Sequence, residues 1–169
     1  MATSVSAPTT TPYDSTRVVQ DGIVAGVLAA AAVALWFFVF DAVRGRPLYT
    51  PSVLGTALFG RGAFGSLETT RVSIEMVLMF TWVHGLAFVV LGAFASWLLS
   101  VAERSPHLGF GIVLLFVIFE GCFTAAAYLI AAPVLRALAW PAVIVANFLA
   151  AAVMAGYLWW RHRSLQMEP

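Results

Sequence analysis

A stretch of nineteen residues without a single charge, residues 22–40, places the strongest constraint on what this chain can fold into. A helix rises about 1.5 Å per residue, so this stretch is about as long as the hydrocarbon core of a bilayer is thick. Three further apolar segments follow it. With 62% hydrophobic and 10% charged residues, the chain has more apolar surface than a soluble domain of 169 residues buries. The sequence therefore predicts an all-α membrane protein.

The apolar segments predict a bundle of four transmembrane helices. We expect the helices at about residues 18–43, 72–101, 106–132 and 139–160, in a transmembrane domain over residues 17–163. Residues 1–16 are rich in Thr, Ser, Ala and Pro and are expected to form a flexible tail, with a second short tail over residues 164–169. Short connections after the second and third helices predict that the last three helices are antiparallel neighbours.

The connection between the first two helices, residues 44–71, is long and apolar. Thr50 as N-cap, Pro51 as first helical residue and Gly60 as C-terminal stop predict one short interfacial helix within it. We expect four apolar side chains of this helix to lie flat in the membrane interface: Val53, Leu54, Leu58 and Phe59. The residues predicted to form an interaction surface here are Pro47, Tyr49, Pro51, Leu54 and Phe59.

Three strongly polar side chains lie deep in the predicted helices at similar depths. His84, Asn147 and Glu120 are expected about 13, 13 and 18 Å below the face that carries the long connection. A carboxylate near the bilayer centre costs several kcal/mol unless it is protonated or paired, so the sequence predicts that the three side chains meet. They form either an interhelical network that fixes the packing or a proton or ligand site that opens toward the connection.

His84 is also a candidate cofactor ligand. A single histidine near the midplane can be one axial ligand of a haem or a chlorophyll-type pigment, and the neighbouring Gly85 leaves room for a macrocycle. A two-histidine haem site within one chain is not predicted, because His107 and His162 fall at helix ends.

The sequence argues against several other classes of function. A metal site is not predicted, because Cys122 is the single cysteine and Glu-x-x-His pairs are absent. An enzyme is not predicted either, since no phosphate loop, nucleophile elbow or HExxH motif occurs. Nucleic acid is not an expected partner, because the net charge is only +1.

Small residues mark one face of the first helix. Gly22 and Gly26, continued by Ala30 and Ala34, are spaced four apart and predict the close approach of a neighbouring backbone. The arginines are divided almost equally between the two ends of the bundle, which leaves the orientation weakly determined. From the lack of a signal peptide and the Trp-Trp-Arg-His-Arg ending, we expect both termini in the cytoplasm and the protein in the inner membrane of a bacterium.

As a whole the sequence resembles uncharacterised bacterial four-helix membrane proteins over about residues 20–163. The likeness rests on Arg46-Pro47-Leu48-Tyr49-Thr50-Pro51 leading to Leu54-Gly55, on His84-Gly85 followed by Ala102-Glu103-Arg104, on Glu120, and on Asn147-Phe148-Leu149-Ala150-Ala151 leading to Gly156-Tyr157-Leu158-Trp159. The resemblance implies a four-helix transmembrane fold and brings no activity with it.

These observations lead to three hypotheses for the function. The first is a non-catalytic subunit or accessory component of a larger membrane complex, whose partners are the lipid bilayer and other membrane proteins or further copies of itself. The second is a small proton-linked transport protein that uses Glu120 with His84 and Asn147. The third is a haem- or pigment-binding subunit that uses His84.

Overall fold

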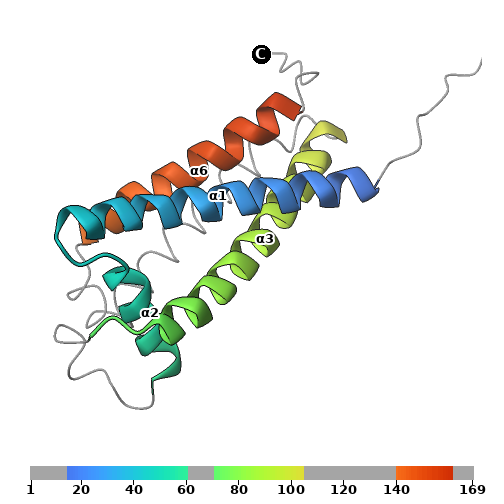
Figure 1. Cartoon of the computed structure of the whole chain (residues 1–169). Helices are drawn as coiled ribbons and strands as arrows, with labels where there is room; N and C mark the ends of the chain where they lie inside the picture. Colours follow the sequence, from blue (N-terminus) through green and yellow to red (C-terminus); the bar gives the residue numbers. More distant parts are fainter. Residues whose placement is uncertain (1–14, 61–70, 105–139, 162–169) are drawn as a thin grey trace, which may run out of the picture.

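The computed structural model describes residues 15–60, 71–104 and 140–161, and the regular structure in these ranges is entirely helical. The helices are α1 (Ser15–Val43), α2 (Tyr49–Phe59), α3 (Ile74–Arg104) and α6 (Trp140–Arg161) (Figure 1). Three of them, α1, α3 and α6, are long and apolar enough to cross a membrane, as a multi-pass membrane protein requires. The helix predicted over residues 106–132 and most of both predicted tails lie outside the described residues.

Helix α1 is the centre of the described structure. Both α3 and α6 pack against it, and they barely touch each other. In Figure 1, α6 runs alongside α1 in the opposite direction, whereas α3 crosses α1 near its N-terminal end. The buried residues in the first half of α1 come in adjacent pairs, Asp21 with Gly22, Ala25 with Gly26 and Ala29 with Ala30. One row of these pairs faces α6 and the other faces α3.

The α1–α3 contact is a ladder of paired residues. Along α1 the pairs are Val18 with Ser96, Gly22 with Gly92, Gly26 with Phe88 and Ala30 with His84. Each step advances four residues on α1 and goes back four on α3. Helices whose four-residue rows pack together in this way usually cross at about 50°. The predicted close approach at Gly22 and Gly26 is confirmed, since a methyl group at Gly22 would lie 2.5 Å from the Cα atom of Ala93. Ala34 does not continue the row, because it is exposed.

The α1–α6 contact is also built from small residues. Ala29 and Val33 of α1 are buried together with Ala146 and Ala150 of α6. At the far end of the contact the indole Nε1 of Trp36 donates a hydrogen bond to the backbone carbonyl of Ala142 over 2.9 Å. Alanines spaced four apart let the two helices lie close together along most of their length.

Helix α2 fills the space where α1 and α3 diverge (Figure 1). Val53 is fully buried, so its predicted place in the membrane interface is wrong. It packs with Tyr49, Leu54 and Ala57 of its own helix and with Val143 of α6. These contacts place α2 beside the first residues of α6.

Close backbone contact also fixes α2 against α3. A methyl group at Gly55 would collide with the backbone carbonyl of Met76, and the backbone N–H of Ser73 donates to the Ser52 hydroxyl over 2.9 Å. Helix α2 therefore has one side that is fixed to the protein. Its other side carries the exposed Leu58 and Phe59.

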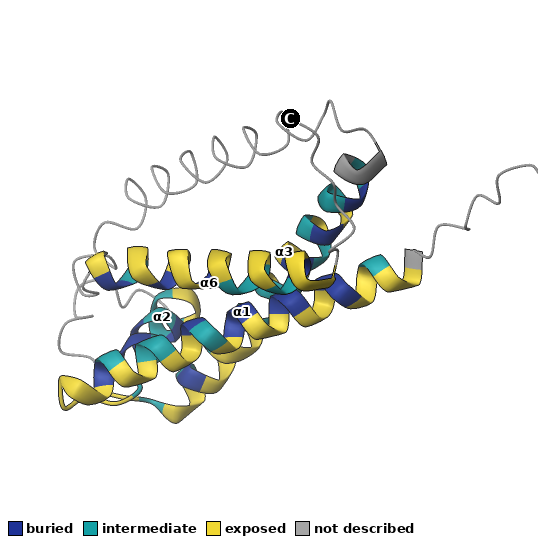
Figure 2. Ribbon diagram, turned by 90° about the horizontal axis from the view of Figure 1, so that it is seen from above, coloured by how far each residue is buried: buried dark blue, intermediate teal, exposed yellow. Residues whose placement is uncertain are grey.

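The outer faces of the long helices are apolar and exposed (Figure 2). In water such a surface would favour aggregation, whereas hydrocarbon solvates it. Among the described residues the buried apolar side chains are mostly alanine and valine. Close helix packing, rather than a large apolar interior, therefore holds the described helices together.

Candidate functional site

His84 lies at the last step of the α1–α3 ladder. Its Nε2 atom is 3.4 Å from the backbone carbonyl oxygen of Ala30, a long contact that the tautomer with a proton on Nε2 makes as a hydrogen bond. The imidazole ring lies between Phe80 and Phe88, with ring centroids 5.4 and 4.7 Å away. In the described structure His84 is therefore a half-buried packing residue whose polar edge faces the backbone of α1.

The predicted cluster of His84, Glu120 and Asn147 stays a prediction. Glu120 lies outside the described residues. Asn147 lies on α6 next to the buried Ala146 and is itself exposed. Within the described ranges the side chains of His84 and Asn147 are on helices that pack against α1 and barely touch each other. A meeting of the three side chains would therefore depend on where Glu120 lies.

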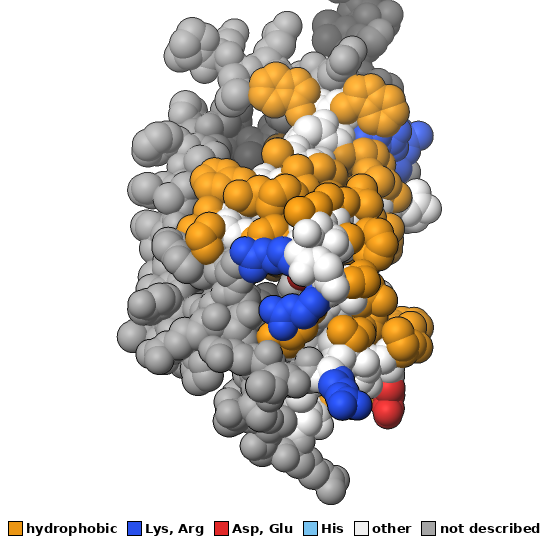
Figure 3. Space-filling view, turned by 60° about the vertical axis from the view of Figure 1, so that its left-hand side comes forward, with side chains coloured by type: hydrophobic (Ala, Val, Ile, Leu, Met, Phe, Trp, Pro, Cys, Tyr) orange, Lys and Arg blue, Asp and Glu red, His pale blue; other side chains and the backbone are white. Residues whose placement is uncertain are grey.

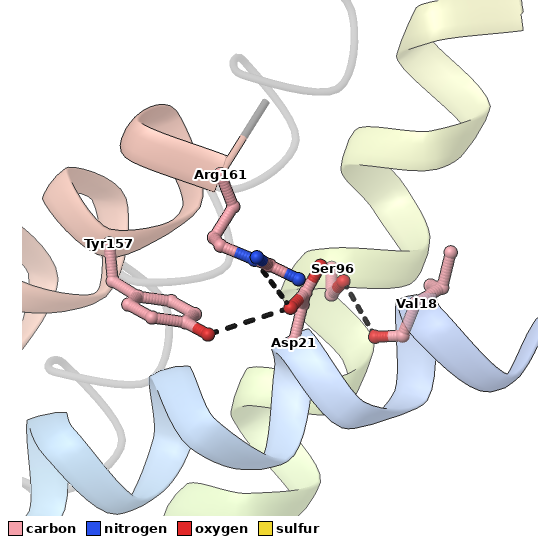
Figure 4. A network of polar contacts seen from close by, with 5 residues as sticks. All are labelled: Val18, Asp21, Ser96, Tyr157 and Arg161. Atoms are coloured by element: carbon pink, nitrogen blue, oxygen red, sulfur yellow. Dashed lines mark hydrogen bonds and ion pairs between the residues drawn. The ribbon is translucent and has the colours of Figure 1, made fainter. Parts of the chain in front are cut away.

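A polar network joins the three long helices at one end of the molecule (Figure 4). Asp21 of α1 is only 7% exposed, and its carboxylate accepts a hydrogen bond of 2.9 Å from Nε of Arg161 at the end of α6. The hydroxyl of Tyr157 lies 3.5 Å from the same oxygen. Beside this pair the hydroxyl of Ser96 donates to the Val18 carbonyl and ties α3 to α1.

A second buried carboxylate lies at the opposite end of α1. Asp41 is 2% exposed, and both of its oxygens are occupied by Thr50: the backbone N–H donates over 2.6 Å and the hydroxyl over 2.8 Å.

Thr50 is therefore not the N-cap that we predicted. Leu48 is the N-cap, with a left-handed backbone at φ 65° and no side-chain cap, and Asp41 caps α2 from the preceding helix instead. The predicted stop at Gly60 is confirmed, because its N–H bonds the carbonyl of Thr56.

The residues predicted to form an interaction surface in the connection do not share one environment. Tyr49 is buried, and Leu54 packs against it and Val53. Pro47 and Phe59 are exposed, and Pro51 is intermediate.

Arginines gather at the end of the molecule where α1 ends, beside an apolar surface (Figure 3). Arg44 and Arg46 follow α1, and both are exposed. The guanidinium of Arg44 lies 4.2 Å from the centroid of the Phe40 ring, and that of Arg46 lies 4.1 Å from the centroid of Tyr49. Stacking on an aromatic ring holds each guanidinium in place while its edge remains available for hydrogen bonds.

The outward face of α3 carries an exposed tryptophan within the segment that is long and apolar enough to cross a membrane. Trp82 is 80% exposed and lies eight residues after Ile74, up to about 12 Å along the helix from its start. No hydrogen bond to its indole N–H occurs within the described residues. Leu78 and Leu86, one turn to either side, are exposed as well.

Comparison with known proteins gives no relative. No family model, curated protein or solved structure matches the chain.

The described side chains limit the chemistry that this part of the molecule can perform. In residues 15–60, 71–104 and 140–161, no group of three His, Cys, Asp or Glu side chains is placed to hold a metal ion. The buried carboxylates of Asp21 and Asp41 accept hydrogen bonds from Arg161 and Thr50 at the ends of helices. What these ranges do offer is an exposed apolar face on α3 and an arginine pair at the end of α1.

The sequence analysis did not predict the partners of the two aspartates, Asp21 and Asp41. A signal existed in both cases. In the predicted four-helix bundle the first and last helices run in opposite directions, and this prediction alone would have placed Asp21 and Arg161 at the same end. A carboxylate at a helix C-terminus such as Asp41 is unfavourable beside the helix dipole and therefore needs a donor from elsewhere.

Proposed function

We propose that the protein is a non-catalytic integral membrane subunit of a larger membrane complex, and that the outward face of α3 is the surface that binds its partner. The observation that carries this proposal is Trp82. Its indole has a polar N–H that finds no acceptor among the described residues, although it belongs to a segment that can cross a membrane. Hydrocarbon offers no acceptor to such a donor, and tryptophans exposed to lipid are usually found at headgroup level instead.

The partner that this face fits is an apolar transmembrane helix with a hydrogen-bond acceptor at the level of Trp82. The face is a row of exposed residues spaced four apart, namely Leu78, Trp82, Leu86 and Val90. Such a row matches a second helix that lies along α3. A central tryptophan surrounded by smaller apolar side chains is also the usual composition of an interaction hot spot.

Replacing Trp82 with alanine is expected to weaken the complex by about 2 kcal/mol or more, which is about thirtyfold in the dissociation constant. The measurement is the mass of the native assembly in mild detergent, with the wild-type chain and the variant expressed in the same bacterial host. The wild type should be purified in a complex, with a second membrane protein or with further copies of itself. The variant should be found mainly as a free chain.

Two further variants separate the hydrogen bond from the apolar contact. Trp82→Phe keeps an aromatic ring and removes the N–H, whereas Leu86→Ala removes exposed apolar surface one turn away. We expect Trp82→Phe to weaken the complex more than Leu86→Ala. A wild-type protein that is a stable monomer with no bound protein would rule out the proposal.

The proposal extends to the placement of the chain in the membrane. The ion pair between Asp21 and Arg161 puts the start of α1 and the end of α6 at one end of the molecule, which supports an even number of spans. We propose a four-helix bundle with residues 106–132 as the remaining span. The exposed Leu58 and Phe59 support an interfacial position for the outer side of α2.

We also propose that the protein lies in the inner membrane of a bacterium with both termini in the cytoplasm. A fluorescent protein that matures only in the cytoplasm, fused after Pro169, should therefore be bright, and alkaline phosphatase fused at the same position should be inactive. The opposite pair of results would show that the end of α6 faces the periplasm.

The position of His84 favours the subunit hypothesis over the two alternatives. Its Nε2 atom faces the backbone carbonyl of Ala30, so a haem or pigment would have to displace that contact or use Nδ1. A proton-linked transport role through Glu120, His84 and Asn147 finds no added support in the described residues. We therefore assign His84 to the packing of α3 on α1.

A further inference from the structure

We infer that Arg44 and Arg46 bind the phosphate of an anionic phospholipid headgroup at the end of α1. This inference is independent of the proposed function and of the orientation in the membrane. It rests on the level of the two side chains, on their fixed geometry and on the lack of an ion pair between them and a carboxylate of the described residues.

The length of α1 determines the depth of the two arginines relative to the hydrocarbon core. Asp21 and Asp41 are 20 residues apart, or about 30 Å along a helix, which is the thickness of the hydrocarbon core. Arg44 and Arg46 follow Asp41 by three and five residues. They therefore lie just beyond the hydrocarbon, at the level where lipid phosphates are found.

The geometry of the arginines is fixed by two rings and a turn. Gly45, between them, has a backbone φ of 72°, and the N–H of Arg46 bonds the backbone carbonyl of Asp41 over 3.0 Å. The guanidinium groups lie over the rings of Phe40 and Tyr49. A stacked guanidinium loses little further side-chain freedom on binding, and its fork of N–H donors matches two phosphate oxygens.

The charge of the pair is not neutralised by the part of the protein that the structure describes. The nearest buried carboxylate, Asp41, is occupied by Thr50, and neither arginine forms an ion pair within the described ranges. At the other end of the molecule Arg161 is paired with Asp21. Within the described residues Arg44 and Arg46 therefore keep a positive charge that can attract an anion from the membrane.

The test uses the full chain in mild detergent and native mass spectrometry with added lipid. The probes are phosphatidylglycerol and phosphatidylcholine with identical acyl chains. We expect the wild type to retain phosphatidylglycerol at least about fivefold more tightly than phosphatidylcholine, and Arg44→Gln or Arg46→Gln to reduce that preference about fivefold. Far-UV circular dichroism and the melting temperature should be unchanged in both variants, because the two side chains are exposed.

Two controls distinguish a specific binding site from nonspecific electrostatic attraction. Arg71→Gln removes an exposed arginine that stacks on no ring in the described structure, and it should leave the preference nearly unchanged. The double variant Arg44→Lys/Arg46→Lys keeps both charges and loses the stacked guanidinium forks, so it should lose most of the preference. An equal effect of Arg71→Gln, or full preference in the lysine variant, would overturn the assignment.

Two further outcomes would also overturn it. Equal retention of the two lipids would show that the arginines bind something else, such as an acidic segment of a protein. Displacement of phosphatidylglycerol by millimolar inorganic phosphate would show that free phosphate, rather than the lipid, is the ligand. We expect inorganic phosphate to leave the bound lipid in place, because the acyl chains add apolar contact that a free ion lacks.

Discussion

Replacement of Gly26 by alanine is expected to lower the free energy of unfolding by about 1–3 kcal/mol, a large effect for the addition of one methyl group. The added group would lie 2.8 Å from the Cα of Val89 and would collide with the carbonyl of Phe88. Ordinary contact between carbon atoms needs about 3.5 Å or more. Both obstacles are backbone atoms, so a side-chain rotation cannot relieve the collision, and α3 must move away from α1. The measurement is unfolding by dodecyl sulfate in mixed micelles, followed by far-UV circular dichroism.

The matched control is Gly85→Ala in α3. At Gly85 an added methyl group meets nothing within 4 Å among the described residues. Alanine there should stabilise the helix by about 0.5–1 kcal/mol, since glycine is the poorer helix former. The close-packed ladder would be contradicted if Gly26→Ala were as stable as Gly85→Ala.

The second large effect is expected at Asp41. Asp41→Ala removes an acceptor that satisfies both the N–H and the hydroxyl of Thr50 in a buried position. Hydrogen bonds to a charged group contribute about 1.5–3 kcal/mol each, so we expect a loss of about 3 kcal/mol or more. The same capping bonds hold the turn in which Leu48 takes its left-handed backbone, so α2 should detach from α3 before the rest unfolds. Limited proteolysis of the variant in micelles should show faster cleavage around α2.

Two variants make the Asp41 prediction specific. Thr50→Val removes the hydroxyl and keeps the backbone donor, so it should cost about 1.5 kcal/mol, roughly half of the loss expected for Asp41→Ala. Glu75→Ala removes an exposed carboxylate near the same end and should change the stability by less than about 0.5 kcal/mol. If Asp41→Ala matched Glu75→Ala, the buried cap would contribute nothing to the fold.

The features that the sequence predicts well are those that depend on neighbours along the chain. The long apolar segments and the four-residue spacing of Gly22 and Gly26 are local patterns, and the structure confirms three apolar helices and the close approach. The matching row on α3, where Gly92, Ser96 and Ser100 are also spaced four apart, was visible in the sequence. It becomes meaningful only once the two rows are known to face each other.

The errors concern contacts between distant residues. Thr50 has the chemistry of an N-cap, but the side chain that caps α2 comes from nine residues earlier, in a different helix. Val53 looked suited to a lipid surface because a hydrophobic residue is equally at home in lipid and in a protein core. Its contact with Val143 of α6 could not be predicted from the sequence of its own segment. A similar predicted depth of His84, Glu120 and Asn147 fixes their level but not their direction around each helix, so it does not determine which side chains face one another.

The ion pair between Asp21 and Arg161 constrains how the protein is made. The two residues are separated by 140 positions, so at about 5–20 residues per second the ribosome needs roughly 7–28 seconds to reach the arginine after making the aspartate. During that time α1 leaves the insertion machinery before Arg161 has been made. Asp21 must then stay hydrated near the surface until the last span arrives. Synthesis of α6 therefore completes the environment of α1, and chains that stop early should be recognised by quality-control proteases.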